Sequence, residues 1–141
     1  MGVSFHNEQI TFDFQKRSRH TDWIDACIDH HRKIAGEITF IFTSNAHLLR
    51  INKAYLNHDY FTDVITFDYS EGEVISGDIF ISIEQVEENA SIYGAEREDE
   101  LRRVMIHGVL HLIGFSDQLP DEQEVMKEME NEALHLWLKV E

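Results

Sequence analysis

The sequence is poor in cysteine, in proline and in long apolar runs, and two of these shortages exclude a class of protein. Cys27 is the only cysteine, so the chain cannot form an internal disulfide. Nowhere do about eighteen or more apolar residues run together, which excludes a membrane-spanning helix. The first residues have neither the basic start nor the apolar run of a signal peptide. We therefore expect a cytoplasmic protein.

Positive charge is also scarce. The chain has 12 lysine and arginine residues against 27 aspartate and glutamate residues, which gives a formal charge of −15 at pH 7. A surface with this charge repels a polyanion unless basic residues gather locally. Two short basic clusters exist, at residues 16–20 and 30–33. Either can form an edge that faces nucleic acid, and the alternative is that both are ordinary solvated surface.

The length and the hydrophobic content set the expected architecture. A chain of 141 residues that is 43% hydrophobic can bury a real core, and neither a linker nor a repeat interrupts it. We therefore predict a single domain over residues 1–141.

Hydrophobic periodicity predicts the order strand, helix, strand, helix, two strands and three helices. This order indicates an α/β (α+β) fold, with a small mixed four-stranded sheet packed with about five helices. The strands are expected at residues 9–14, 37–43, 76–82 and in a stretch ending at Phe67. The helices are expected at residues 23–34, 46–56 and 84–93, at a segment opened by the acidic residues 96–100, and after Pro120. The last helix has an apolar stripe of Val125, Met126, Met129, Ala133, Leu134, Trp137 and Leu138.

The fourth predicted helix carries the clearest chemical motif. His107 and His111 are four residues apart, so their imidazoles project from one helix face and can converge on one point. Gly114 can end the helix in a left-handed conformation, and the chain can then fold back to present Asp117. Two nitrogens and one oxygen, with a fourth position left open, are the donor set of a catalytic zinc site. The motif therefore predicts a metal held by His107, His111 and Asp117.

Two alternatives accompany this interpretation. The first alternative is that the two histidines are hydrogen-bonded core residues. The helix around them is apolar on nearly every side, which is typical of a buried central helix. The glutamate that serves as base in H-E-x-x-H metalloproteases is replaced here by Gly108, so a peptidase mechanism lacks its base. Three further residues are spare candidates for a metal ligand: Asp121, Glu124 and His135.

The segment from His107 to Asp117 resembles the signature of the YbeY family, H-G-x-L-H-L-x-G-Y-D-H. The first two ligands, both glycines and the leucines match, whereas Asp117 stands where most of the family has a third histidine. The resemblance implies a metal-dependent endoribonuclease of rRNA maturation, acting in 16S rRNA 3′-end processing and ribosome quality control. It also implies one zinc ion per chain, with RNA and the small ribosomal subunit as partners. A carboxylate ligand is harder than imidazole and tolerates manganese or magnesium better.

A second segment, from Tyr55 to Phe67, resembles the family pattern Y-R-x-K-D-x-P-T-D-V-L-S-F. The residues that coincide with this pattern are Asp59, Thr62, Asp63, Val64 and Phe67, and Gly77-Asp78-Ile79 matches the family further on. Leu56 stands at the arginine that the family associates with catalysis, and His58 stands at its lysine. If the resemblance holds, the substrate's charge must be met by His58, Arg50 or Lys53. Thr62 and Asp63 either line the substrate site or only shape the loop.

The resemblance leads to a mechanistic hypothesis in which a phosphodiester of single-stranded RNA is cleaved. The residues leave open whether water or the 2′-hydroxyl attacks, and His58 is a candidate proton carrier because histidine titrates near neutrality. Because Leu56 removes a charge, we expect weak activity on naked RNA and delivery by a ribosomal partner. Two other functions stay open, a zinc-dependent hydrolase of another substrate class and a non-catalytic ribosome-assembly factor with a structural metal.

Overall fold

The computed structural model describes residues 2–57 and 62–140, and within them the chain forms four strands and five helices. The predicted order of elements and the predicted α/β (α+β) fold class are both confirmed. In chain order the elements are β1 (Gly2–Asn7), α1 (Arg17–His30), β2 (Ile34–Thr43), α2 (Asn45–Leu56), β3 (Val64–Asp68), β4 (Val74–Ser82), α3 (Ile83–Tyr93), α4 (Arg97–Ile113) and α5 (Pro120–Trp137).

The four strands form one mixed sheet in the order β1-β2-β4-β3. Strand β2 pairs in parallel with β1 and with β4, so helices must connect these strands across the sheet. Strand β3 lies at one edge and pairs antiparallel with β4, with Ile65 opposite Phe80 and Phe67 opposite Asp78. A tight turn joins β3 to β4, where Glu71 pairs with Val74 and Gly72 has a φ of 58°.

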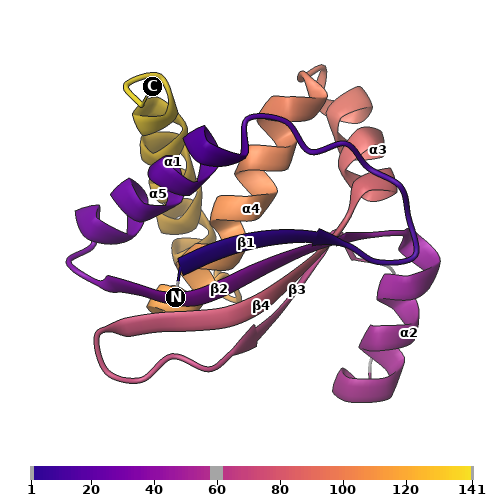
Figure 1. Ribbon diagram of the computed structural model, residues 1–141, viewed down its shortest axis with the longest axis horizontal. Coiled ribbons are helices and arrows are strands. Elements are labelled where there is room, and N and C mark those ends of the chain that lie inside the picture. Colours follow the sequence, from indigo (N-terminus) through magenta and orange to yellow (C-terminus); the bar gives the residue numbers. More distant parts are fainter. Residues whose placement is uncertain (1, 58–61, 141) are drawn as a thin grey trace.

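The helices cover the two faces of the sheet unequally. Helices α1, α3, α4 and α5 lie on one side and α2 lies on the other, near one end of the strands (Figure 1). The main core fills the space under α4, and residues such as Ile79, Met105 and Ile106 are wholly buried there. A second, smaller core lies under α2 and consists of Leu48, Ile51 and Ile65. Helix α4 thus packs between the sheet and the other helices, which matches its predicted central position.

Short polar side chains set where the helices around the sheet begin. The Ser44 hydroxyl accepts a hydrogen bond from the backbone of His47 and starts α2, and Ser82 does the same for α3. Helix α3 ends at Gly94, whose φ of 67° suits a residue without a side chain. Among the helices of the described residues, none combines the length and the apolarity needed to cross a membrane.

Three details of the sequence prediction are wrong. Residues 9–14 form no strand; the N-terminal strand is β1, while Phe12 and Phe14 pack their rings near Phe42 from an irregular segment. Helix α1 begins at Arg17 and ends at His30, and Ile34 belongs to β2. The side chains of Val125 on α5 and of Leu138, which directly follows this helix, are exposed, although both were expected in an apolar stripe that packs on the core.

Candidate metal centre

Helix α4 presents His107 and His111 at the point where the chain leaves the helix. At Gly114 φ is 121°, a conformation that a residue with a side chain rarely adopts. The Gly114 N–H donates to the carbonyls of Leu110 and His111 and closes the last turn. The chain then reverses, and Asp117 returns to the two imidazoles. The structure therefore brings together the three side chains that the sequence proposed as ligands.

The distances in this cluster suit a small cation. Nε2 of His107 lies 3.0 Å from Nε2 of His111. Oδ2 of Asp117 lies 3.2 Å from Nε2 of His107 and 3.7 Å from Nε2 of His111. Ligands held at about 2.0–2.1 Å around a tetrahedral zinc ion are separated from one another by about 3.3 Å, close to these values. Within the described residues, this is the one group of three such side chains whose ligand atoms lie within 4.8 Å of one another.

The other ring nitrogen of each histidine points away from the cluster and has its own acceptor. Nδ1 of His111 lies 2.9 Å from the carbonyl oxygen of Phe115, and Nδ1 of His107 lies 2.7 Å from Oε2 of Glu130. Since a carbonyl and a carboxylate accept, each Nδ1 carries the ring proton in the neutral imidazole. Both Nε2 atoms then offer lone pairs to the same point as the Asp117 oxygen. Three acceptors without a proton between them fit a metal ion, and a histidine tied in this way is typical of a metal ligand.

The electrostatic surroundings of His107 follow from the same contacts. Burial by itself lowers the pKa of His107, but the hydrogen bond and charge of Glu130, followed by the charges of Asp117 and Asp63, outweigh it and raise the pKa above its usual value. The pocket is thus negative enough to hold a cation, either a proton or a metal. Protons and metal ions compete for such a nitrogen.

Glu130 is a functional side chain that the sequence interpretation missed. It is 8% exposed, and its second carboxylate oxygen accepts a hydrogen bond from Nη1 of Arg103 at 2.9 Å. Arg103 in turn donates to Asn131. Glu130 shares the buried face of α5 with Met126, and a carboxylate on an otherwise apolar stripe was the signal that could have found it.

The cluster opens onto two hollows of about 430 Å³ each, both of which are lined by His107 and Asp117. The hollow toward β3, which we call the metal cleft, is also lined by Thr62, Asp63, Val64, Ile65, Thr66, Asn52, Leu56 and His111. Asp63 Oδ2 accepts a hydrogen bond from Asn89 at 3.3 Å. Burial raises the pKa of the Asp63 carboxyl, although the charge of His107 acts against this. Thr62 and Asp63 therefore lie on the wall of the metal cleft.

The other candidates are distributed as follows. Leu56 lines the metal cleft with an apolar side chain, whereas Arg50 and Lys53 are exposed on the same helix, α2. His58 lies outside the described residues. The spare ligands Asp121, Glu124 and His135 belong to no ligand group of the described part of the chain. In the first basic cluster, the guanidinium of Arg19 stacks on Trp137.

The structure also explains why a glycine stands where a metalloprotease has its glutamate. Gly108 faces the sheet, and a Cβ placed there would lie 2.8 Å from Cγ2 of Ile79 and 3.2 Å from Cγ2 of Thr66. Helix α4 can approach the sheet this closely only because residue 108 has no side chain. A glutamate at this position would collide with Ile79 of β4 and Thr66 of β3.

Known proteins resemble this chain over nearly its whole length. The sequence model of the family described as Endoribonuclease YbeY matches residues 3–137. The Endoribonuclease YbeY of Bacteroides thetaiotaomicron is 46% identical over 134 residues, which are 95% of this chain and 98% of that protein. That of Flavobacterium psychrophilum is 46% identical over 135 residues, 96% of each chain. The solution structure of TM1509 from Thermotoga maritima superposes with a TM-score of 0.67 at 25% identity, covering 96% of this chain and 88% of that one.

Proposed function

This chain belongs to the YbeY endoribonuclease family, and from that premise we propose that it is a metal-dependent endoribonuclease that cleaves single-stranded RNA. The single observation that supports the metal dependence is the convergence of Nε2 of His107, Nε2 of His111 and Oδ2 of Asp117 at the mouth of a cleft. We propose His107, His111 and Asp117 as the metal ligands, and we propose that residues 1–141 form one domain.

Zinc is the proposed metal, at one ion per chain, because the three ligands offer nitrogen and oxygen without a thiolate. When bound there, zinc would supply a Lewis acid that polarises a phosphoryl oxygen or makes a water molecule more acidic. The protein's own contribution is to fix the two imidazoles through Glu130 and the Phe115 carbonyl, so that the cleft does not have to reorganise when RNA enters.

Residues on the wall of the metal cleft are proposed to bind the substrate. The Thr62 hydroxyl can donate a hydrogen bond to a phosphate oxygen, and Asp63 is held in place by Asn89. His58 is proposed as a proton carrier, because a histidine with an ordinary pKa exchanges a proton near neutral pH. With Leu56 in the metal cleft, the phosphate meets less positive charge on this wall than an arginine would offer.

The proposed cellular role is rRNA maturation in the cytoplasm, including 16S rRNA 3′-end processing and ribosome quality control. A formal charge of −15 repels naked RNA, which supports delivery of the substrate by the small ribosomal subunit or its proteins. Neither alternative, a hydrolase of another substrate class or a non-catalytic assembly factor, is favoured by the relatives, which are named as endoribonucleases.

A short single-stranded RNA incubated with zinc-loaded protein tests the proposal. We expect slow cleavage into defined fragments, and mass analysis of the fragment ends distinguishes the two routes. Attack by the 2′-hydroxyl leaves a cyclic phosphate, whereas attack by water leaves an open phosphate and a hydroxyl. The absence of cleavage at every ratio of protein to RNA, with and without small ribosomal subunits, would contradict the proposal.

The matched control is His111→Ala, prepared in parallel. This variant loses one of the three proposed ligands and should cleave no faster than a blank. Cleavage that survives in His111→Ala, or in the parent protein after chelation, would point to a contaminating ribonuclease or to a route that needs no metal.

A further inference from the structure

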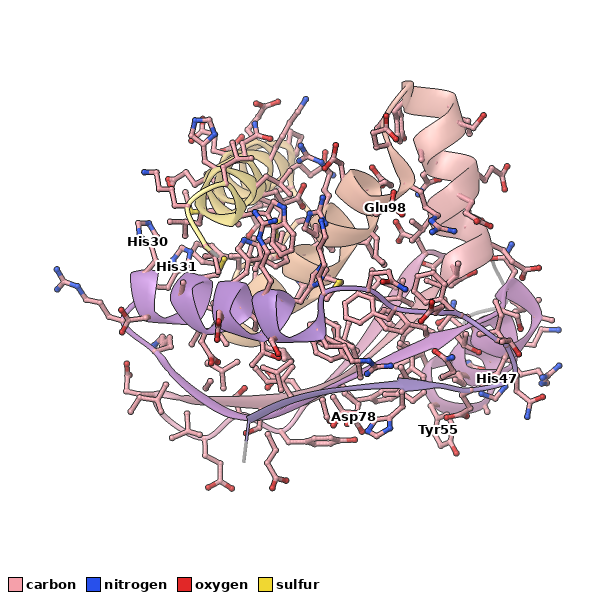
Figure 2. The ribbon with its side chains drawn as sticks, turned by 45° about the horizontal axis from the view of Figure 1, so that its top comes forward. His30, His31, His47, Tyr55, Asp78 and Glu98 are labelled. Atoms are coloured by element: carbon pink, nitrogen blue, oxygen red, sulfur yellow. The ribbon has the colours of Figure 1, made fainter. Side chains whose placement is uncertain are left out.

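A further hollow lies on the opposite face of the sheet from α4, beside α2. It measures about 430 Å³, and we call it the outer groove. Its lining residues are Glu8, His47, Ile51, Tyr55, Phe67, Tyr69, Asp78 and Phe80. Figure 2 shows His47, Tyr55 and Asp78 together below the strands, on the other side of the sheet from His30, His31 and Glu98. The proposed metal ligands do not line this groove.

Aromatic rings dominate the outer groove. The Tyr55 and Phe67 rings meet edge to face with their centroids 6.0 Å apart, and Phe67 meets Phe80 in the same way at 5.8 Å. Tyr55 is 73% exposed and Tyr69 is 59% exposed, so both rings leave a large apolar face in water. Rigid exposed rings beside a hollow are suited to stacking against a flat ligand.

The charge around the outer groove is mixed, because Glu8 and Asp78 line it while the neighbouring helix α2 carries basic residues. Helix α2 is the only one of the five helices in the described residues that contains no aspartate or glutamate, and it carries Arg50 and Lys53. The carboxylates in the groove already have partners. Glu8 lies 2.6 Å from Nε2 of His47, and Asp78 accepts a hydrogen bond from the Tyr69 hydroxyl. In a chain with a formal charge of −15, this helix is a local exception.

The outer groove and the metal cleft lie on either side of the edge strand β3, and both are lined by residues of α2. On α2, Asn52 and Leu56 line the metal cleft, whereas the adjacent Ile51 and Tyr55 line the outer groove. On the edge strand β3, the corresponding neighbours are Thr66 and Phe67. A chain molecule that passes over β3 can therefore occupy both hollows at once.

We propose that the outer groove binds single-stranded RNA, with the bases beside the cleaved phosphate stacked on Tyr55 and Tyr69. This inference rests on the proposed endoribonuclease function and adds a site for the part of the substrate that is not cut. Stacking needs bases whose faces are free, so the groove accepts a single strand and rejects a duplex. It also provides affinity that does not depend on the positive charge missing at Leu56.

Fluorescence anisotropy with a labelled single-stranded RNA tests the proposal, in the His111→Ala background so that the probe stays intact. Tyr55→Ala and Tyr69→Ala should each weaken binding about tenfold, the loss expected for one stacked base. Tyr55→Phe keeps the ring and should bind like its parent. Ile92→Ala is the control, because Ile92 on α3 is also a large apolar side chain, 66% exposed, that lines neither the outer groove nor the two hollows beside the metal cluster, and it should change nothing.

Several results would overturn the proposal. These are parent-like affinity in the Tyr55→Ala, Tyr69→Ala double variant, a loss in Ile92→Ala alone, or equal competition by duplex RNA. A self-association lost in the double variant while RNA affinity is unchanged would identify the groove as a contact between copies of the chain. Repeating the titration with unmodified His111 and a chelator makes the result independent of that background.

Failure of this inference is distinguishable from failure of the proposed function. If the parent protein cleaves RNA and the groove variants bind like the parent, the groove inference fails alone. If the groove variants lose affinity but the parent never cleaves RNA, the groove binds RNA and the catalytic proposal fails.

Discussion

Oε2 of Glu130 lies 2.7 Å from Nδ1 of His107, although the two residues are 23 positions apart and belong to different helices. This contact makes α5 part of the candidate metal centre, because the carboxylate favours the ring orientation in which Nε2 of His107 faces the cluster. Arg103 holds the same carboxylate from the other side.

Replacing Glu130 with glutamine should weaken zinc binding about 10- to 100-fold, the usual cost of losing a carboxylate behind a metal-bound histidine. The amide keeps the shape of the side chain but not its charge. Isothermal titration with zinc measures the change. Glu128→Gln, on an exposed position of the same helix, should bind zinc like the parent, and equal losses in both variants would contradict the role of Glu130.

Asp117→Ala should weaken zinc binding by more than about 100-fold, because it removes one of three ligands and not an outer partner. Asp117→His should retain or strengthen binding, since imidazole is a better zinc donor than a carboxylate in this geometry. The same titration checks both variants. Unchanged affinity in Asp117→Ala would place the third ligand elsewhere, with Asp121 and His135 as the next residues to test.

Gly108→Ala should destabilise the fold. The added methyl group meets the buried Ile79 at 2.8 Å, and overpacking of this kind costs about 1–3 kcal/mol, against about 1 kcal/mol gained in helix propensity. We expect a net loss on the order of 1 kcal/mol in denaturant unfolding. If the contact is the cause, Ile79→Ala should cost less in the Gly108→Ala background than alone. Strict additivity of the two losses would rule out the steric explanation.

Stability should fall on mild acidification through His20. Burial lowers the pKa of this residue from 6.5 to about 4 in the folded chain. The hydrogen bond to the Lys16 carbonyl raises the pKa, whereas the positive charges of Arg102 and Arg19 lower it further. Between these two values the unfolded chain binds the extra proton, so stability is lost as the pH falls and the loss is complete below about pH 4. From pH 7 to pH 5 the contribution is on the order of 2 kcal/mol.

The His20→Phe variant isolates this contribution. The phenyl ring can keep the contacts of His20 with Phe14 and Trp137, whose ring centroids both lie 4.5 Å from the imidazole. Denaturant unfolding at pH 7 and pH 5 should show a smaller loss in the variant than in the parent. Equal losses would assign the acid sensitivity to the carboxylates.

The sequence predicted the fold well where the spacing of the apolar residues matches the backbone hydrogen bonding, as in strand β4 and helix α3. It was misleading at residues 9–14, because Phe12 and Phe14 alternate like a strand and are packed like one, yet the chain there does not pair along β2. An alternation of apolar and polar residues indicates which side chains are buried, but it does not indicate whether the backbone pairs with a neighbouring strand. The start of α1 was placed too late for a related reason, since the polar Arg19 packs through a stacked guanidinium and not through apolar atoms.

The ligand cluster could be proposed from spacing because its members lie within one helix and the turn after it. The role of Glu130 could not be proposed from the sequence. Its partner His107 is brought to it only by the docking of α5, and no local sequence pattern predicts that docking. The outer groove was missed for the same reason: Tyr55 and Phe67 meet only when α2 crosses β3.

The contact between α4 and α5 forms late, because α5 is the last helix of the chain to be synthesised. His107, His111 and Asp117 all leave the ribosome before Glu130, and α5 is fixed to the rest of the molecule by the Trp23 indole, which donates to the Ala133 carbonyl at 2.6 Å. Until α5 docks, the three proposed ligands are present, but Glu130 does not yet hold the ring of His107. We therefore expect a nascent chain to exchange its metal quickly and a chain with α5 docked to retain it, so that metal retention reports the last step of folding.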